Sequence, residues 1–112
     1  MAKMIFIVHR RADQTREQCY AQWAGAQHTA IVKSVPGLRR WVQNRVTTAA
    51  NGSACDGIGE LWFDSPAALD QALNSPEMAA AAEDAKRFLD MERTTMVIVG
   101  EDTILEQPQE PR

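Results

Sequence analysis

The chain has 112 residues and a formal net charge of −3; 45% of its residues are hydrophobic and 24% are charged. This length provides one domain with its own core, and the slightly acidic balance argues against nucleic acid as a partner. The two cysteines, Cys19 and Cys55, are too few for a disulfide framework and lack metal-ligand spacing, so we expect free thiols in a reducing compartment.

The first predicted element is a strand at residues 4–8, an apolar run rich in β-branched side chains that suits burial on both faces. Polar and charged residues at 9–14 end this run, which is far too short for a signal sequence or a membrane span. We therefore expect a cytoplasmic protein without a membrane partner.

A helix is predicted next, because Thr15 and Gln18 have the spacing of a capping box. Apolar residues recur at helical spacing between residues 19 and 31, so one face of this helix should meet the core. The Pro-Gly pair at residues 36–37 ends the helix, since proline cannot continue it and glycine permits the turn.

Two strands are predicted at residues 38–46 and 56–63, separated by a polar loop whose central Asn51-Gly52 is typical of a hairpin turn. Alternation in the second strand assigns its side chains to two faces. One face carries Ile58, Glu60 and Trp62, and the other carries Leu61 and Phe63.

Ser-Pro pairs at residues 65–66 and 75–76 mark two helix starts and divide residues 66–89 into a short helix and a longer one. A fourth strand is predicted at residues 94–99, with a potential extension through Ile104. Residues 106–112 contain two prolines and should form a loose tail, unless they reach across a dimer.

The element order predicts an α+β domain at residues 1–105 with ferredoxin-like βαββαβ topology. A four-stranded antiparallel sheet then carries its helices on one face and leaves the other face open. Because the first, third and fourth strands are apolar on both faces, a monomer would expose apolar surface to water. We therefore expect a homodimer in which two sheets meet face to face as a dimeric α/β barrel.

Two residues are candidates for catalysis. His28 lies at the edge of the apolar stripe of the first helix and is either an acid or base in a pocket or a helix-flank histidine bonded to a carbonyl. Glu60 lies mid-strand, where a carboxylate either orients His28 or acts as a base itself. The alternative for Glu60 is a structural ion pair with Arg39 or Arg45 of the neighbouring strand.

Other side chains are candidates for ligand binding. Trp23, Trp41 and Trp62 are many tryptophans for so short a chain, and they form either the core or the flat walls of a small-molecule pocket. Asn44 lies mid-strand, where asparagine is unfavourable, and bonds either a ligand or an adjacent backbone group.

Motifs for cofactors and metals are absent from the sequence. There is no GxGxxG, P-loop or GxSxG motif, and no His/Cys/Asp/Glu cluster has metal-ligand spacing. A haem would have His28 as its sole plausible axial ligand. We therefore expect no cofactor and no metal.

Three segments resemble the EthD family, which takes its name from a gene of ethyl tert-butyl ether degradation. They are residues 20–23 (YAQW) followed by His28, residues 36–44 (PGLRRWVQN) and residues 56–64 (DGIGELWFD). The resemblance covers residues 3–105 and implies a dimeric α/β barrel, in a superfamily that includes isomerases, cyclases and cofactor-independent monooxygenases.

The resemblance also bears on single residues. It implies that His28 points into the cleft between helices and sheet, and it adds Tyr20 to the expected ligand contacts. Trp41 stands where most members have tyrosine, so a phenol donor is lost. Lactone-isomerising relatives use a strand thiol near the position of Leu61. This chain has no thiol there, which argues against that activity.

Two classes of function remain open. The first is a cofactor-independent enzyme, either an oxidoreductase of monooxygenase type or an isomerase or cyclase. In it, His28 would remove a proton from a small aromatic or polyketide/lactone-like metabolite. The second is a non-catalytic protein that binds a hydrophobic metabolite as an accessory of a degradation pathway.

Overall fold

The computed structural model describes residues 1–48 and 55–108. In this part of the chain, strands and helices follow the βαββαβ order that the sequence predicts, and each helical segment consists of two helices. The elements are β1 (Ala2–Val8), α1 (Arg16–Trp23), α2 (Ala26–Lys33), β2 (Arg40–Arg45), β3 (Gly57–Phe63), α3 (Pro66–Leu73), α4 (Pro76–Ala85) and β4 (Thr95–Val99).

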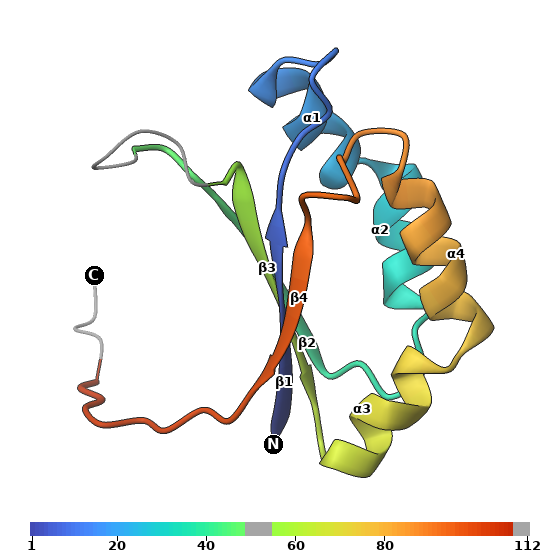
Figure 1. Cartoon of the computed structure of the whole chain (residues 1–112). Helices are drawn as coiled ribbons and strands as arrows, with labels where there is room; N and C mark the ends of the chain where they lie inside the picture. The colour runs from blue at the N-terminus through green and yellow to red at the C-terminus, as the bar shows by residue number, and fades with distance from the viewer. Residues whose placement is uncertain (49–54, 109–112) are drawn as a thin grey trace.

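The sheet has the strand order β2-β3-β1-β4, and each neighbouring pair is antiparallel. All helices of the described residues cover one face of this sheet, and the other face is left open (Figure 1). This confirms the predicted α+β fold with ferredoxin-like topology.

Alternation along the central strands separates the two faces of the sheet, as predicted. Met4 of β1 pairs with Leu61 of β3, and both side chains lie in the core beneath the helices. The next pair in register, Ile5 and Glu60, projects from the open face. The face toward the helices therefore holds the core, while the open face is mixed in character.

The prediction of a single helix between residues 15 and 36 is wrong, because the chain forms two helices, α1 and α2. Gly25 has extended backbone angles, φ −70° and ψ 158°, and is the N-cap of α2. A Cβ at Gly25 would lie 2.8 Å from the carbonyl oxygen of Ala21, so this close approach requires glycine. The break brings α2 alongside α4 (Figure 1).

The predicted helix starts are confirmed. Thr15 and Gln18 form the capping box of α1, with reciprocal bonds of 3.1 and 2.9 Å between side chain and backbone. Ser65 and Ser75 cap α3 and α4, each accepting a bond from the backbone N–H three residues later. These caps satisfy N–H groups that the first helical turn leaves without partners.

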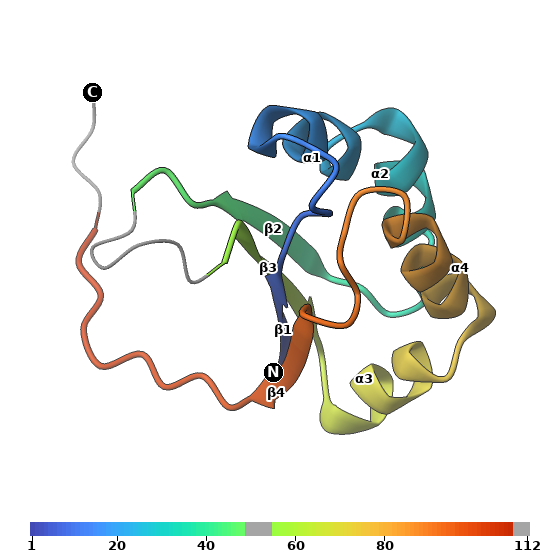
Figure 2. The same ribbon diagram turned by 45° about the horizontal axis from the view of Figure 1, so that its top comes forward.

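The C-terminal part of the chain differs from one expectation. β4 ends at Val99, and residues 100–108 leave the sheet without regular structure instead of extending the strand through Ile104. They lead away from the sheet on the side of its open face (Figures 1 and 2), and Ile104 and Leu105 are exposed. The predicted turn at Asn51-Gly52 and the last four residues of the predicted tail lie outside the described residues.

Within the residues that the structure describes, neither Cys19 nor Cys55 forms a disulfide bond. Burial raises the pKa of the Cys19 thiol to about 11. Cys19 is therefore protonated at neutral pH and packs as a small apolar group against Trp23 and Phe88.

Candidate functional site

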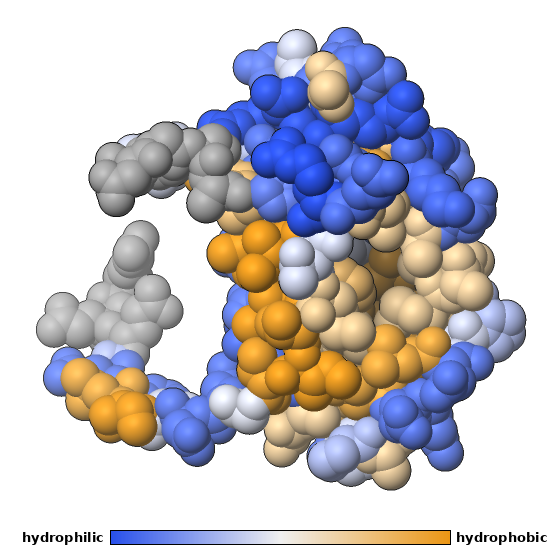
Figure 3. All heavy atoms as spheres, in the orientation of Figure 1, coloured by the Kyte–Doolittle hydropathy of each residue, from blue (hydrophilic) through white to orange (hydrophobic). Residues whose placement is uncertain are grey.

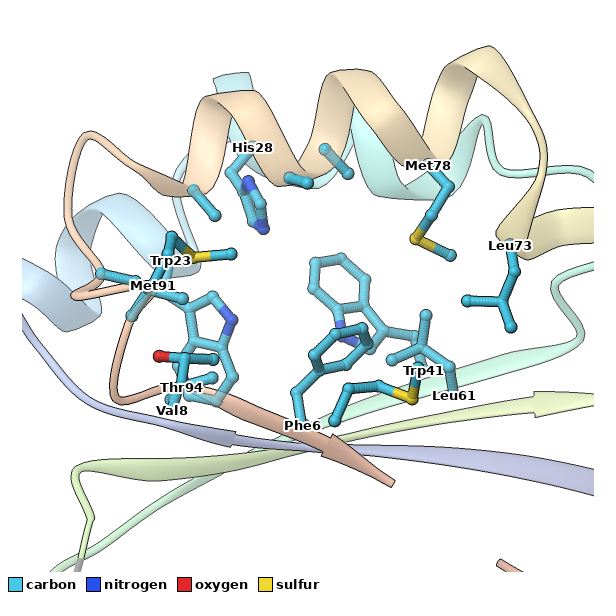
Figure 4. A pocket seen from close by; sticks show the side chains of 16 residues that line it. Phe6, Val8, Trp23, His28, Trp41, Leu61, Leu73, Met78, Met91 and Thr94 are labelled. Carbon is cyan, nitrogen blue, oxygen red and sulfur yellow. The ribbon is translucent and has the colours of Figure 1, made fainter. Parts of the chain in front are cut away.

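A pocket of about 190 Å³ lies between the sheet and helices α2 and α4 (Figure 4). Its mouth opens beside the edge strand β4, where Figure 3 shows a hollow bordered by apolar surface. Met91 and Met96 are partly exposed at this mouth. The walls are formed mainly by large apolar side chains, among them Phe6, Trp23, Trp41, Leu61, Leu73 and Met78.

Small residues create the space. Ala81, Ala82 and Ala85 of α4 line the roof of the pocket, and Gly59 of β3 lies in its floor. These positions place little or no side-chain volume between helix and sheet, so the large walls around them cannot close the gap. The run of alanines in α4, which reads as a simple helix former, therefore also shapes the pocket.

Trp23 is fixed against the backbone of β3. A Cβ added at Gly57 would lie 2.7 Å from Cζ3 of Trp23, and one added at Gly59 would lie 3.4 Å from Cζ2. The indole thus rests directly on two glycines of the strand. The glycines of the DGIGE segment therefore allow the Trp23 indole to approach the strand closely, and they are not there to form a turn.

His28 projects from α2 toward the sheet and into the pocket (Figure 4). Only 5% of the residue is exposed. The imidazole meets the ring of Phe88 edge-on, with centroids 5.0 Å apart, and lies 6.3 Å from the ring of Trp41. These contacts with the rings of Phe88 and Trp41 help to hold the imidazole in one orientation.

Asp84 of α4 is the hydrogen-bond partner of His28. Nδ1 of His28 lies 2.9 Å from Oδ2 of Asp84, and this pair joins α2 to α4. Arg87 donates to both oxygens of Asp84, at 2.8 and 3.0 Å, and Gln27 donates to Oδ1 at 2.7 Å. Mainly through the bond from Arg87, the pKa of Asp84 is lowered to about 2.

These contacts define the state of His28 at neutral pH. Burial lowers the pKa of His28 below its ordinary value of 6.5, although the bond to Asp84 acts in the opposite direction. The imidazole is therefore neutral, and the Asp84 carboxylate accepts the proton carried by Nδ1. The lone pair of Nε2, on the other side of the ring, faces the pocket as a base.

The structure brings together three of the predicted site residues. His28, Trp23 and Trp41 all line the pocket. Tyr20 does not line it; the phenol donates to the backbone oxygens of Val46 and Asp56, at 3.2 and 2.6 Å. Tyr20 thus holds the ends of β2 and β3 against α1.

The expected contact between Glu60 and His28 is not formed, because Glu60 projects from the open face of the sheet. Its Oε1 lies 2.8 Å from Nζ of Lys3, and its Oε2 accepts a bond of 3.0 Å from Asn44. The ion pair expected as the alternative exists, but its cation is Lys3 of β1 rather than Arg39 or Arg45. The bond from Lys3 lowers the pKa of Glu60.

Trp62 also belongs to the open face. Lys3 and Arg40 lie over its ring, each with the charged group 4.5 Å from the ring centroid. Glu101 accepts from Nε1 of Trp62 at 3.3 Å and pairs with Lys3 at 3.1 Å. Glu60, Trp62 and Asn44 thus form a polar cluster on the face opposite the pocket.

Sequence reasoning missed Asp84, although a signal was present. Ala81, Asp84, Ala85 and Phe88 recur at helical spacing, which places a carboxylate on the buried stripe of α4. A charge on such a stripe needs a partner. The identity of that partner, His28, depends on how α2 and α4 cross and could not be inferred from spacing.

Among residues 1–48 and 55–108, no group of three or more His, Cys, Asp or Glu side chains is arranged to hold a metal ion. No helix in these same ranges is both long and apolar enough to cross a membrane.

The chain is similar to one known family and to a relative whose description names no family. A family model described as the EthD domain matches residues 11–92. A relative from Rhodococcus erythropolis, described as an uncharacterized 11.0 kDa protein in the thcB-thcC intergenic region, is 28% identical over 81 residues, 71% of this chain and 78% of the relative.

Two solved structures have the same fold. An ethyl tert-butyl ether d (EthD) family protein from Bacillus halodurans has a TM-score of 0.75 at 24% identity, covering 91% of this chain and 99% of that one. A dimeric ferredoxin-like protein of unknown function from Thermobifida fusca has a TM-score of 0.65 at 14% identity, covering 89% and 90%.

Proposed function

This chain belongs to the EthD domain family, and we propose that its pocket is the active site of a cofactor-independent enzyme in which His28 is the general base. One observation carries the proposal. Asp84 holds Nδ1 of His28 at 2.9 Å, which leaves Nε2 directed at an apolar pocket of about 190 Å³. A base whose tautomer is fixed by a carboxylate is the arrangement that proton abstraction requires.

The substrate class follows from the walls. The rings of Phe6, Trp23 and Trp41 offer flat apolar surfaces, which suit a small aromatic or polyketide/lactone-like metabolite. Asp84 replaces Glu60 as the group that orients the base. It acts through His28, so it is a positioning residue rather than a catalytic one.

The reaction we propose first is of oxidoreductase, monooxygenase type. Nε2 of His28 takes a proton from an activated methylene, and the electron pair of the C–H bond stays on the substrate as a carbanion. Dioxygen, as co-reactant, then accepts electrons from this carbanion. One oxygen atom becomes a carbonyl of the product and the other leaves as water, so the methylene is oxidised and dioxygen is reduced.

An isomerase or cyclase reaction is the alternative with the same first step. His28 removes the proton, and the carbanion is then reprotonated at another atom or closes a ring without consuming dioxygen. Both reactions share the proton transfer, so the first experiment should measure that transfer directly.

The test is deuterium incorporation at carbon in D2O, measured by mass spectrometry on a panel of ketones, lactones, hydroquinones and polyketide-like aromatics, with dioxygen uptake followed in parallel. Incorporation should depend on His28 and be lost in His28→Gln. His9→Gln is the matched control, because His9 does not line the pocket. Incorporation with uptake supports the monooxygenase, and incorporation without uptake supports the isomerase or cyclase.

A non-catalytic binding function is favoured by the small number of polar groups in the pocket. Among the described residues of the lining, His28 and Thr94 contribute polar side-chain atoms in addition to the indole nitrogens. Stoichiometric binding without any His28-dependent deuterium incorporation would identify an accessory ligand-binding protein. A cytoplasmic location, a role in catabolism and the domain boundary at residue 105 stay predictions from the sequence.

The second part of the proposal is a homodimer formed through the open face of the sheet. Ile5, Ile7, Ile58 and Val97 supply apolar surface on this face, and 38% of Val97 is exposed. The charges of Lys3 and Glu60 neutralise each other there. The neighbour from Thermobifida fusca is described as dimeric, which supports the same assembly here.

Sedimentation equilibrium tests the dimer. Wild-type protein should be dimeric at micromolar concentration, and Val97→Asp should weaken the dimer by about a hundredfold or more, since it buries an unpaired charge. Ala79→Asp, on the exposed side of α4, is the control and should stay dimeric. A monomeric wild type, or an unaffected Val97→Asp dimer, would contradict this interface.

A further inference from the structure

No described side chain in the lining of the pocket is ionised at neutral pH. Among the described residues that form it, there is no lysine, arginine, aspartate or glutamate, and His28 is the single titratable side chain. The ring of His28 is neutral because it is buried, as described above. A ligand therefore meets apolar walls and neutral polar atoms alone.

We propose that the pocket selects uncharged ligands, of the class of neutral phenols and enolisable ketones, and rejects the same skeletons when they carry a carboxylate, sulfate or phosphate. The proposal rests on the proposed site but not on turnover. It names a property of the substrate class that the apolar character of the pocket alone would leave open, because many apolar pockets also hold a cation for an acidic substrate.

Three cations outside the lining are engaged by other partners. Arg87 donates two bonds to Asp84, at 2.8 and 3.0 Å, and so lies behind the imidazole rather than in the pocket. Lys3 and Arg40 lie over Trp62 on the opposite face of the sheet. An anion entering the pocket would lose its hydration without gaining a countercharge, which is strongly unfavourable.

The polar atoms that do face the pocket suit a neutral hydroxyl or carbonyl compound. Nε2 of His28 is an acceptor for a ligand O–H. The hydroxyl of Thr94 accepts from the backbone N–H of His9 at 3.2 Å, so its own proton is free to donate. The indole N–H groups of Trp23 and Trp41 have no hydrogen-bond partner within residues 1–48 and 55–108. A ligand oxygen can therefore be bonded without any charge.

The size of the pocket narrows the class further. Its volume of about 190 Å³ is below the roughly 300–1,000 Å³ that is usual for pockets that hold drug-sized molecules. A ligand with one ring or two small fused rings fits this space. Charge is then produced inside the site, since transfer of the ligand proton to Nε2 creates an anion beside an imidazolium that Asp84 stabilises.

The test compares 4-hydroxyacetophenone with 4-hydroxybenzoate, which have the same shape and differ by a methyl group in place of a carboxylate oxygen. Binding is measured at pH 7 by calorimetry and by quenching of tryptophan fluorescence, which Trp23 and Trp41 report from the pocket walls. The neutral probe should bind at least about tenfold more tightly. Equal affinities, tighter binding of the anion, or no binding of the neutral probe up to its solubility limit would overturn the proposal.

A gain of anion binding provides the second measurement. Met91 lines the mouth of the pocket and is 37% exposed, so a longer charged side chain fits there without burial. Met91→Lys should improve binding of 4-hydroxybenzoate by about tenfold or more, while Met91→Gln, a side chain of similar length without a charge, should not produce this gain. No gain in Met91→Lys would count against a selectivity set by charge. Failure of deuterium incorporation would refute the base function and leave this selectivity standing.

Discussion

Replacement of Asp84 by asparagine tests the reasoning about His28 most directly. The carboxylate of Asp84 can only accept a bond from Nδ1 of His28, at 2.9 Å, so it keeps the proton on Nδ1. An asparagine amide at the same place donates as well as accepts. Where its NH2 group faces Nδ1, the proton of the imidazole moves to Nε2, and the pocket loses its base.

Two magnitudes follow from the contacts. Loss of a correctly protonated base should slow His28-dependent deuterium incorporation by about 10²–10⁴-fold. The free energy of unfolding should fall by about 1–3 kcal/mol, the range for losing charged hydrogen bonds. The larger penalty of an orphaned buried charge does not apply, because the Arg87 side chain is 38% exposed and can return to water.

The assay is nitrogen NMR of the histidines combined with the exchange rate. Wild-type His28 should show a protonated Nδ1, and Asp84→Asn should show a protonated Nε2, with the signals of His9 unchanged as an internal reference. Glu83→Gln is the matched control, because the Glu83 carboxylate pairs with Lys86 at the surface, away from His28. An unchanged tautomer together with an unchanged exchange rate in Asp84→Asn would refute the positioning role.

Three further predictions concern stability. Gly57→Ala should push Trp23 off the strand, because the new Cβ would lie 2.7 Å from Cζ3, and urea unfolding should show a loss of about 1–3 kcal/mol. Tyr20→Phe removes a donor to two backbone oxygens and should lower the free energy of unfolding by about 1–2 kcal/mol in urea. Ligand affinity, measured by calorimetric titration, should not change. The pKa of Asp84 is about 2 in the folded protein against an ordinary value of 3.8, so its stabilisation is present above pH 3.8 and lost as pH falls toward 2. The gap in urea midpoint between wild type and Asp84→Asn should therefore narrow over that window, and a constant gap would contradict the assignment.

Much of the fold could be predicted because it rests on short-range patterns. The period of two in residues 57–63 fixes which side chains share a face, and the Thr15, Ser65 and Ser75 caps fix where helices begin. Each of these signals acts within about four residues of the chain. The order of these elements then predicts the ferredoxin-like architecture in which they pack, and the family resemblance implies the same architecture.

The errors have a different origin, since they depend on contacts between distant segments. Gly25 breaks the first helix because of a close approach to Ala21, which is not visible as a turn motif. His28 and Asp84 are 56 residues apart, and their contact depends on the crossing of α2 and α4. Glu60 was expected to serve His28 because a carboxylate within an apolar strand indicates a partner, but the pattern does not say on which face that partner lies.

The alternation of side chains along β3 explains why the carboxylates of Glu60 and Asp84 have separate roles. Gly59 and Leu61 face the pocket, while Glu60 lies between them in sequence and faces the other side of the sheet. A carboxylate at a pocket-facing position of β3 would introduce a charge directly into the ligand space, where none of the described lining residues is a lysine or arginine. Placing the orienting carboxylate on α4 behind His28 avoids this, because Asp84 fixes the base while Arg87 and the imidazole screen its charge from the pocket. The apolar walls and the activated base are therefore compatible only because the charge is kept in the helical layer.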